Sequence, residues 1–203
     1  MSGRRWIFRL FILLLVCAAF SYFIASRISQ NLNEQILTQI VLVAQSLPAD
    51  EIRTLNFTPD DVQLPAFHSL TKRTQESAKM LGSTSVYLMR KQGDVIRFGP
   101  ESLSEGNPLA SPPGTPYLRP PEPLRSVFDT RQATTVGPYK DEYGAFVSAF
   151  APIIDKESGA LVGVVGADIT AGSWYYYVTM RALLPSIVDR KSTRLNSSHI
   201  TIS

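Results

Sequence analysis

The sequence has a single cysteine, Cys17, and only two histidines, His68 and His199, among its 203 residues. One cysteine cannot form a disulfide within the chain, and a thiolate metal site needs more than one. Two histidines are also too few for a histidine-based metal centre. The sequence therefore predicts neither a disulfide framework nor a metal site, and no cofactor is expected.

The sequence also lacks a basic surface, although its formal net charge is +3. Positive charge is concentrated at the two ends, with Arg4, Arg5 and Arg9 at one end and three basic residues against Asp189 within residues 189–203. The middle of the chain is therefore slightly acidic. A surface suited to a phosphate backbone is not indicated, and nucleic acid is not expected as a partner.

Catalytic and nucleotide-binding motifs are missing as well. The chain contains no phosphate loop, nucleophile elbow or paired-histidine zinc motif. Gly159, Gly163 and Gly166 suggest a dinucleotide-binding pattern, but their spacing is wrong and they fall within an expected strand. Small residues in a strand are more typical of close packing or of a cavity wall. We expect no catalytic activity from this chain.

What the sequence does contain is a long hydrophobic run over residues 6–28, uncharged from Leu10 to Ser26. At about 1.5 Å per residue, a helix of this length crosses roughly 30 Å of hydrocarbon. The preceding arginines place residues 1–5 in the cytoplasm. A cleaved secretory signal is the alternative, but the run is longer than a usual signal core. We predict a transmembrane helix in a cell inner membrane, with the following residues on the periplasmic or extracellular side.

A pattern of apolar residues continues beyond this run at helical spacing. Its members are Ile28, Leu32, Ile36, Ile40, Val43 and Leu47. Three- and four-residue spacing predicts one apolar stripe on a helix. The stripe is expected to pack against the following domain or against a second copy of the chain.

The rest of the chain mixes helical and strand patterns. Helices are predicted near residues 48–55 and within 58–82, where Gly82 suits a C-terminal cap. Strands are predicted on both sides of a turn at residues 91–94, and again over 145–155 and 160–169. A short helix is expected near 124–133. The fold class is therefore α+β, an antiparallel sheet with a long N-terminal helix and helices packed on one side.

Eight prolines lie between Pro100 and Pro123. Regular secondary structure does not survive that density, so this segment is predicted to be a long loop. It is either a solvated connection or a lid over a pocket, because long ordered loops are often functional.

The segment GPYKDEYGAFVSAFAPI combines acidic, hydroxyl and aromatic side chains beside a strand. Tyr139, Asp141 and Tyr143 cluster at its start, and Phe146, Ser148 and Phe150 share one face of the strand. Such a carboxylate can pair with an ammonium group between aromatic rings, so the cluster suggests a small-ligand site. The alternative is an ordinary edge loop with Asp141 in water.

Three segments, VYLMRKQGDVIRF, SPPGTPY and GPYKDEYGAFVSAFAPIIDKESGALVGVVGADI, resemble the Cache (PAS-like) sensor domains of bacterial transmembrane receptors. The resemblance is most specific over residues 137–169. It implies a small-molecule sensor over residues 29–170, placed between two membrane helices, with a histidine kinase, diguanylate cyclase or chemoreceptor output. It also implies a homodimer formed through the membrane-proximal helices.

The resemblance further implies that the ligand binds on the concave face of the sheet, under loops from the central region. The candidate residues that match by motif are Tyr87, Arg97, Tyr117, Tyr139, Asp141, Tyr143, Ser148 and Asp168. An alternative role for Asp168 is structural, with its carboxylate bound to nearby backbone amides.

Residues 171–188 read as the start of a second membrane helix, with an aromatic cluster at 174–177 of the kind found at membrane interfaces. Residues 189–203, DRKSTRLNSSHITIS, resemble the in-frame translation of a sequencing adapter and are expected to be non-native. We therefore expect a truncated receptor. The alternatives are a membrane-tethered enzyme, using Asp141 and Asp168 as acid and base, and a structural module without a ligand.

Overall fold

The computed structural model describes residues 2–183, with side chains described for residues 6–182. The predicted tail at 189–203 and the end of the predicted second membrane helix at 184–188 lie outside the described residues. The chain forms two compact units, Asn33–Trp174 on the one hand and the two terminal segments on the other. All the features that bear on a binding site belong to the first unit.

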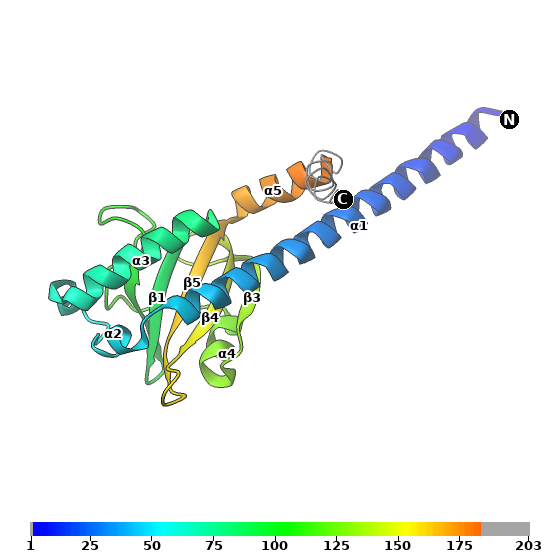
Figure 1. Ribbon diagram of the computed structural model, residues 1–203. Coiled ribbons are helices and arrows are strands. Elements are labelled where there is room, and N and C mark those ends of the chain that lie inside the picture. The colour runs from blue at the N-terminus through cyan, green and yellow to red at the C-terminus, as the bar shows by residue number, and fades with distance from the viewer. Residues whose placement is uncertain (1, 184–203) are drawn as a thin grey trace, which may run out of the picture. The chain divides into compact units, whose positions relative to one another are not determined.

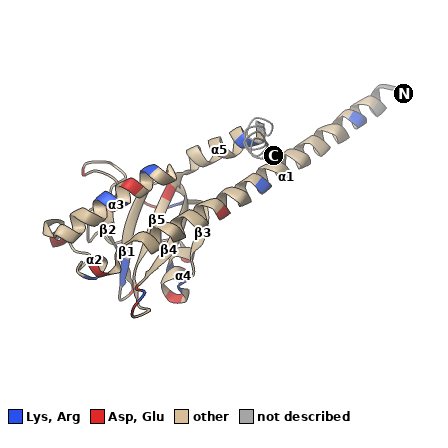
Figure 2. Cartoon of the chain, in the orientation of Figure 1, with Lys and Arg blue, Asp and Glu red and all other residues tan. Residues whose placement is uncertain are grey.

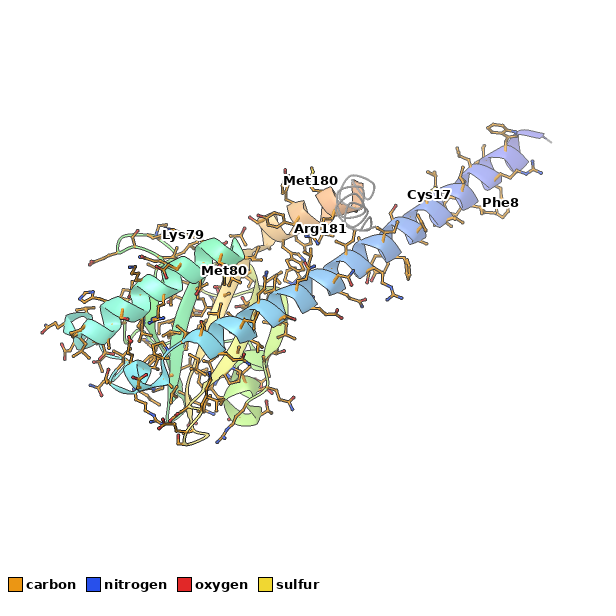
Figure 3. All side chains as sticks on the ribbon, in the orientation of Figure 1. Phe8, Cys17, Lys79, Met80, Met180 and Arg181 are labelled. Atoms are coloured by element: carbon orange, nitrogen blue, oxygen red, sulfur yellow. The ribbon has the colours of Figure 1, made fainter. Side chains whose placement is uncertain are left out.

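Helix α1 spans Ser2–Ser46 without interruption. Its first part is apolar and exposed, and Figure 3 shows the side chains of Phe8 and Cys17 projecting from it. Figure 2 shows how few charges this stretch carries. Within residues 2–183, one helix is long and apolar enough to cross a membrane, over Trp6–Ser46. The long apolar helix expected at the N-terminus is therefore present.

Five strands form one antiparallel sheet with the order β2-β1-β5-β4-β3. The strands are β1 (Ser85–Gln92), β2 (Val95–Glu101), β3 (Thr134–Lys140), β4 (Ala145–Ile154) and β5 (Leu161–Thr170). The last strand of the described residues, β5, lies between β1 and β4, so it joins segments that are far apart in the sequence. The strands predicted on both sides of residues 91–94, over 145–155 and over 160–169 are confirmed.

One face of the sheet, which we call the aliphatic face, is covered by the end of α1, by α2 (Ala49–Arg53) and by α3 (Pro65–Leu81) (Figure 1). A short 3₁₀ helix, Pro59–Gln63, precedes α3, and Gly82 ends α3 with a left-handed φ of 62°, as predicted. The predicted stripe packs here, because Ile40, Val43 and Leu47 are buried in this core. The interpretation in which the stripe packs against its own domain is therefore confirmed for these residues.

The opposite face, which we call the polar face, is covered differently. Helix α4 (Glu122–Thr130) buries Leu124 and Val127 against Met89, Phe150 and Val164 on this side. The α+β class is confirmed, but α4 departs from the expected one-sided packing of helices. The reason is that the proline-rich loop carries the chain over to this face, where Tyr117 joins the same core. The remainder of the face is left to loops and side chains.

Helix α5 (Ala171–Leu183) follows β5 directly. Thr170 caps its start, since the Thr170 Oγ1 accepts a hydrogen bond from the Ser173 backbone N–H at 3.2 Å. Trp174 is buried, whereas the next three tyrosines are exposed. The predicted helical start after the last strand is therefore present up to residue 183.

Candidate functional site

Strand alternation brings a row of polar groups onto the polar face. Ser85 on β1 and Ser148 on β4 are both direct cross-strand partners of Asp168 on β5. Opposite residues of antiparallel strands lie on the same face, with Cβ atoms about 5 Å apart. The sheet register therefore sets two hydroxyl groups on either side of one carboxylate.

Asp168 is 8% exposed and is held by side-chain hydroxyls. Its carboxylate accepts hydrogen bonds from Ser148 Oγ at 2.6 Å, Tyr87 Oη at 2.8 Å and Ser85 Oγ at 3.4 Å. The structural alternative, in which Asp168 binds backbone amides, is not what the structure shows. Burial raises the pKa of Asp168 to about 6; the hydrogen bonds from Ser148 and Tyr87 oppose this rise, and the charge of Asp141 adds to it.

The position of the Tyr87 ring depends on Gly166, its cross-strand partner. A Cβ atom at residue 166 would lie 2.5 Å from the Tyr87 ring. The missing side chain thus gives the ring room to lie over β5 and to reach Asp168. The interpretation of the strand glycines as sites of close packing is confirmed at this position.

Tyr139 reaches the polar face because of an irregularity in β3. Val136 pairs with Ser148, whereas Tyr139, three residues later, pairs with Phe146 only two residues away on β4. The extra residue, at the predicted bend Gly137-Pro138, is a β-bulge, and it puts Val136 and Tyr139 on one face. Tyr139 Oη consequently lies 3.0 Å from Ser148 Oγ.

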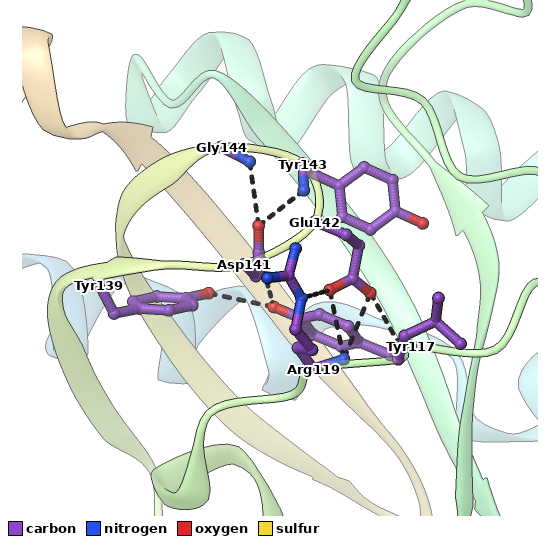
Figure 4. Close-up of polar contacts among 8 residues, drawn as sticks. Tyr117, Arg119, Tyr139, Asp141, Glu142, Tyr143 and Gly144 are labelled. Carbon is purple, nitrogen blue, oxygen red and sulfur yellow. Dashed lines mark hydrogen bonds and ion pairs between the residues drawn. The ribbon is translucent and has the colours of Figure 1, made fainter.

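Asp141 occupies the turn between β3 and β4 and is 5% exposed. Figure 4 shows its carboxylate accepting hydrogen bonds from Tyr117 Oη at 2.5 Å, the Tyr143 N–H at 2.8 Å and the Gly144 N–H at 3.1 Å. The neighbouring Glu142 fixes the incoming loop, because it accepts the Leu118 N–H at 2.7 Å. Asp141 is therefore a buried carboxyl group that takes its hydrogen bonds from the protein, so the alternative with Asp141 in water does not hold.

The two aspartates are joined by a continuous row of hydroxyls. Tyr117 Oη lies 3.3 Å from Tyr139 Oη, which completes the series Asp168, Ser148, Tyr139, Tyr117 and Asp141. Burial raises the pKa of Tyr87, Tyr117 and Tyr139, so these phenols remain protonated. Tyr87 donates to Asp168 and Tyr117 donates to Asp141, whereas the Tyr139 hydroxyl lies beside those of Tyr117 and Ser148. With Tyr87 added to the series, we call these six residues the tyrosine–carboxylate network: Tyr87, Tyr117, Tyr139, Asp141, Ser148 and Asp168.

A small cavity of about 20 Å³, the inner cavity, lies beside this network. Its wall contains three carboxylates, Asp141, Asp168 and Glu101, and none of the described lining residues is a lysine, arginine or histidine. The other lining residues are aromatic, aliphatic or hydroxyl-bearing: Ser85, Tyr87, Phe98, Leu109, Ser111, Tyr117, Tyr143 and Phe146. Burial raises the pKa of Glu101 to about 7, against the hydrogen bond that it receives from the Ser111 N–H. The cavity is thus acidic and holds no cationic side chain.

The structure brings together seven of the eight residues implied by the resemblance. Six form the network, and the Tyr143 ring packs against Phe98 and Tyr117, with ring centroids 5.7 and 6.3 Å apart. Arg97 is not among them. Ile96 and Phe98 on either side of it pack into the polar-face core, so strand alternation turns Arg97 away, and its guanidinium donates to the Gly114 carbonyl at 2.8 Å.

Sequence reasoning missed Ser85, Phe98, Glu101, Leu109 and Ser111 as lining residues, whereas Phe146 was recognised only as a member of the aromatic cluster. A signal existed for Ser85, which alternates with Val86 on β1, and for Phe98, which lies two residues from Ile96 and so on the same face of β2. Leu109 and Ser111 lie in the proline-rich loop, where no periodicity shows which side chains point inward. Their position agrees with the lid interpretation of that loop.

Comparison with known proteins gives a fold match. No family model and no curated protein matches the chain. The sensor domain of DcuS from E. coli superposes with a TM-score of 0.56 at 12% identity, covering 75% of this chain and 98% of that domain. The ligand-binding domain of the Pseudomonas aeruginosa amino acid chemoreceptor PctC, in complex with GABA, gives 0.48 at 16% identity, over 80% of this chain and 66% of that one.

A third structure, the ligand-binding domain of the Pseudomonas fluorescens chemoreceptor CtaA in complex with L-alanine, gives a TM-score of 0.45 at 19% identity, over 78% of this chain and 60% of that one. Of these three structures, the DcuS sensor domain is the one whose TM-score supports a conclusion about the fold. The chain has the fold of that sensor domain, which confirms the predicted Cache-like, PAS-like architecture.

Proposed function

We propose that this chain is the extracytoplasmic sensor of a bacterial transmembrane signalling receptor and that its ligand is a small organic cation with an ammonium group. The observation that carries the proposal is the wall of the inner cavity, with three carboxylates and no cationic side chain among the described residues. The sensor fold and the long apolar helix α1 support it.

The chemistry of the cavity favours a cation over an anion. Ionised carboxylates are costly to bury without a partner, and a bound ammonium group removes that cost. The rings of Tyr87, Tyr117 and Tyr143 add cation–π attraction and exclude water. A ligand carrying only carboxylates would instead be repelled by every ionised carboxyl group of the same wall.

The membrane arrangement follows the charge pattern of the sequence. Helix α1 crosses the inner membrane with its arginine-rich start in the cytoplasm, and the sensor domain faces the periplasm. A second membrane helix begins in α5, and two copies associate through their membrane-proximal helices. These are the features of a receptor that transmits a signal across a bilayer.

The structure offers a short path from the site to α5. Asp168 lies three residues before the first residue of that helix, and its backbone carbonyl accepts the Thr84 N–H at 2.7 Å. Because the inner cavity of about 20 Å³ has room for about one water, a ligand must displace its wall. Ligand binding therefore selects a second arrangement of strand and loop, and this shifts the population of signalling states.

The test is a thermal-shift screen of the full chain in detergent at pH 8, with amines and amino acids set against dicarboxylates. At a concentration of about 100 Kd, a true ligand stabilises the protein by about 2.7 kcal/mol. Asp141→Asn should abolish the shift given by the active amine. Asp94→Asn, at an exposed turn, is the matched control and should leave it intact. Stabilisation by carboxylates alone, or by amines equally well in Asp141→Asn, would contradict the proposal.

A further inference from the structure

A second and larger space, the outer cleft, lies next to the inner cavity. It has a volume of about 800 Å³ and is bounded by α3 and by the proline-rich loop. Apolar groups from Val62, Phe67 and Leu103 line it, together with polar groups from Thr71 and Gln75. The outer cleft is thus large enough for a drug-sized molecule, whereas the inner cavity is not.

One thin stretch of chain separates the two spaces. Leu109 and Ser111 line the inner cavity, whereas Ala110 and residues 112–115 line the outer cleft. Glu101 lines both. Residues 109–115 therefore form a partition that is a single backbone thick, and Glu101 stands at its edge.

The partition is lightly attached on its loop side. The hydrogen bonds recorded for residues 104–110 are local, such as those from the Asn107 N–H to the Ser104 carbonyl and from the Ala110 N–H to the Asn107 carbonyl. The Ser111 N–H donates to Glu101 Oε1 at 2.7 Å, and the firm attachment to β2 begins at Gly114, whose N–H donates to the Phe98 carbonyl. Segments with few hydrogen bonds to the core open at low free-energy cost.

The outer cleft also contains an unsatisfied polar atom. Thr71 Oγ1, on the α3 wall, is buried and has no hydrogen-bond partner within the described part of the chain. Buried hydroxyls in native structures nearly always have a partner. Rotation of the Thr71 side chain toward the cleft would let an oxygen or nitrogen atom of a bound molecule supply one.

From these observations we propose that the outer cleft and the inner cavity are two compartments of one binding site for an extended organic cation. The ammonium end lies at Asp141 and Asp168, the uncharged chain passes Glu101 where residues 109–113 move aside, and a polar group at the far end hydrogen-bonds to Thr71. This assignment rests on the proposed function, because it takes the cationic end from it and adds the length of the ligand.

The test uses a series of linear amino alcohols, from ethanolamine upward, with about two to eight methylene groups, titrated calorimetrically against the full chain in detergent. Each methylene group that enters the outer cleft should tighten binding by about two- to fourfold until the hydroxyl reaches α3. Thr71→Val should weaken the best long member by about three- to tenfold and leave ethanolamine unaffected. Thr130→Val, at an exposed threonine on α4, is the matched control and should change neither.

The outcomes separate the two proposals. If ethanolamine binds in an Asp141-dependent manner but affinity is independent of chain length and of Thr71→Val, the two-compartment site is wrong and the proposed function stands. If no member of the series binds and dicarboxylates bind instead, the proposed function falls, and the two-compartment site falls with it. The melting temperature of each variant without ligand shows whether it is folded.

Discussion

On β1, Val86 and Leu88 point into the aliphatic face, while Tyr87 between them points into the polar face. The same alternation holds on β5, where Ala167 belongs to the aliphatic core and Asp168 to the tyrosine–carboxylate network. The two faces are thus built from the same strands, because successive residues of a strand point to opposite sides of the sheet. One face is packed with aliphatic side chains under three helices, and the other holds buried carboxylates under loops beside helix α4.

The difference separates stability from binding. Burial of apolar area on the aliphatic face stabilises the fold by about 25 cal/mol per Å². The polar face instead holds carboxylates away from water, and the raised pKa values of Asp168 and Glu101 record the cost of that burial. A ligand that pairs with these carboxylates in one state of the protein but not in another would shift the equilibrium between the two states.

The largest expected effect lies on the aliphatic face. Leu88 is fully buried, so Leu88→Ala should lower the free energy of unfolding by about 2–5 kcal/mol, measured by denaturant titration. Ser148→Ala, also fully buried but on the polar face, should cost only about 1 kcal/mol. Equal losses of unfolding free energy at the two positions would contradict the conclusion that the aliphatic face contributes more to stability than the polar face.

The second prediction concerns pH. The folded-state pKa of Asp168 is about 6 and that of Glu101 about 7, both above the ordinary values, so the folded state binds these protons more tightly than the unfolded state. The stability that these two groups contribute is therefore fully present below their ordinary pKa values and is lost as pH rises through about 6 for Asp168 and about 7 for Glu101.

Between pH 5 and pH 8 the melting temperature should fall by roughly 5–10 °C. Asp168→Asn should reduce that fall, and Asp94→Asn, at an exposed turn, should not. Scanning calorimetry across this pH range is the measurement. A melting temperature that rises over the range would mean that the buried carboxylates are already compensated.

A smaller loss of stability is expected from substitution of Gly166, the residue of β5 on which the Tyr87 ring packs. Because a Cβ atom there lies 2.5 Å from the Tyr87 ring, Gly166→Ala should displace the ring and cost about 1–3 kcal/mol. The matched control is Gly172→Ala in α5, where a Cβ atom meets nothing within 4 Å. Denaturant titration of both variants measures the contrast, and similar values for the two would remove the role assigned to Gly166.

The smallest expected effect is at Tyr139. Tyr139→Phe removes one hydroxyl from the network and should cost about 0.5–1.5 kcal/mol in thermal or chemical unfolding. Its effect on affinity for the ligand should exceed its effect on stability, since the hydroxyl joins the two carboxylate ends. A stability loss as large as that of Leu88→Ala would place Tyr139 with the core rather than with the site.

The sequence predicted the elements well because periodicity reports which residues are buried. The stripe through Ile40 and Val43, the alternation around Ser148 and the cap at Gly82 are local patterns, and each corresponds to an observed helix, strand or helix end. Asp141 and Tyr139 could be singled out because they lie close together in one short segment.

The rest depends on tertiary structure. The bulge that turns Tyr139 toward Ser148 requires the register of β3 on β4, which no local pattern fixes. Arg97 was misplaced because its motif match ignored the alternation set by Ile96 and Phe98. Glu101 accepts a hydrogen bond from Ser111, which lies in the proline-rich loop. The path of that loop is determined by tertiary packing and leaves no periodic pattern, so neither residue could be found from the sequence.

The row of hydroxyls between the two aspartates leaves Tyr139 in an unusual position. Tyr117 and Ser148 each direct their one hydroxyl hydrogen to a carboxylate, at 2.5 and 2.6 Å. The hydrogen of Tyr139 then has two oxygen atoms to choose from, Tyr117 Oη at 3.3 Å and Ser148 Oγ at 3.0 Å. A positive charge arriving beside Asp141 changes the relative strength of these two acceptors. The orientation of the Tyr139 O–H bond is thus coupled to the charge at the β3–β4 turn, and through Ser148 this coupling extends to Asp168 on β5.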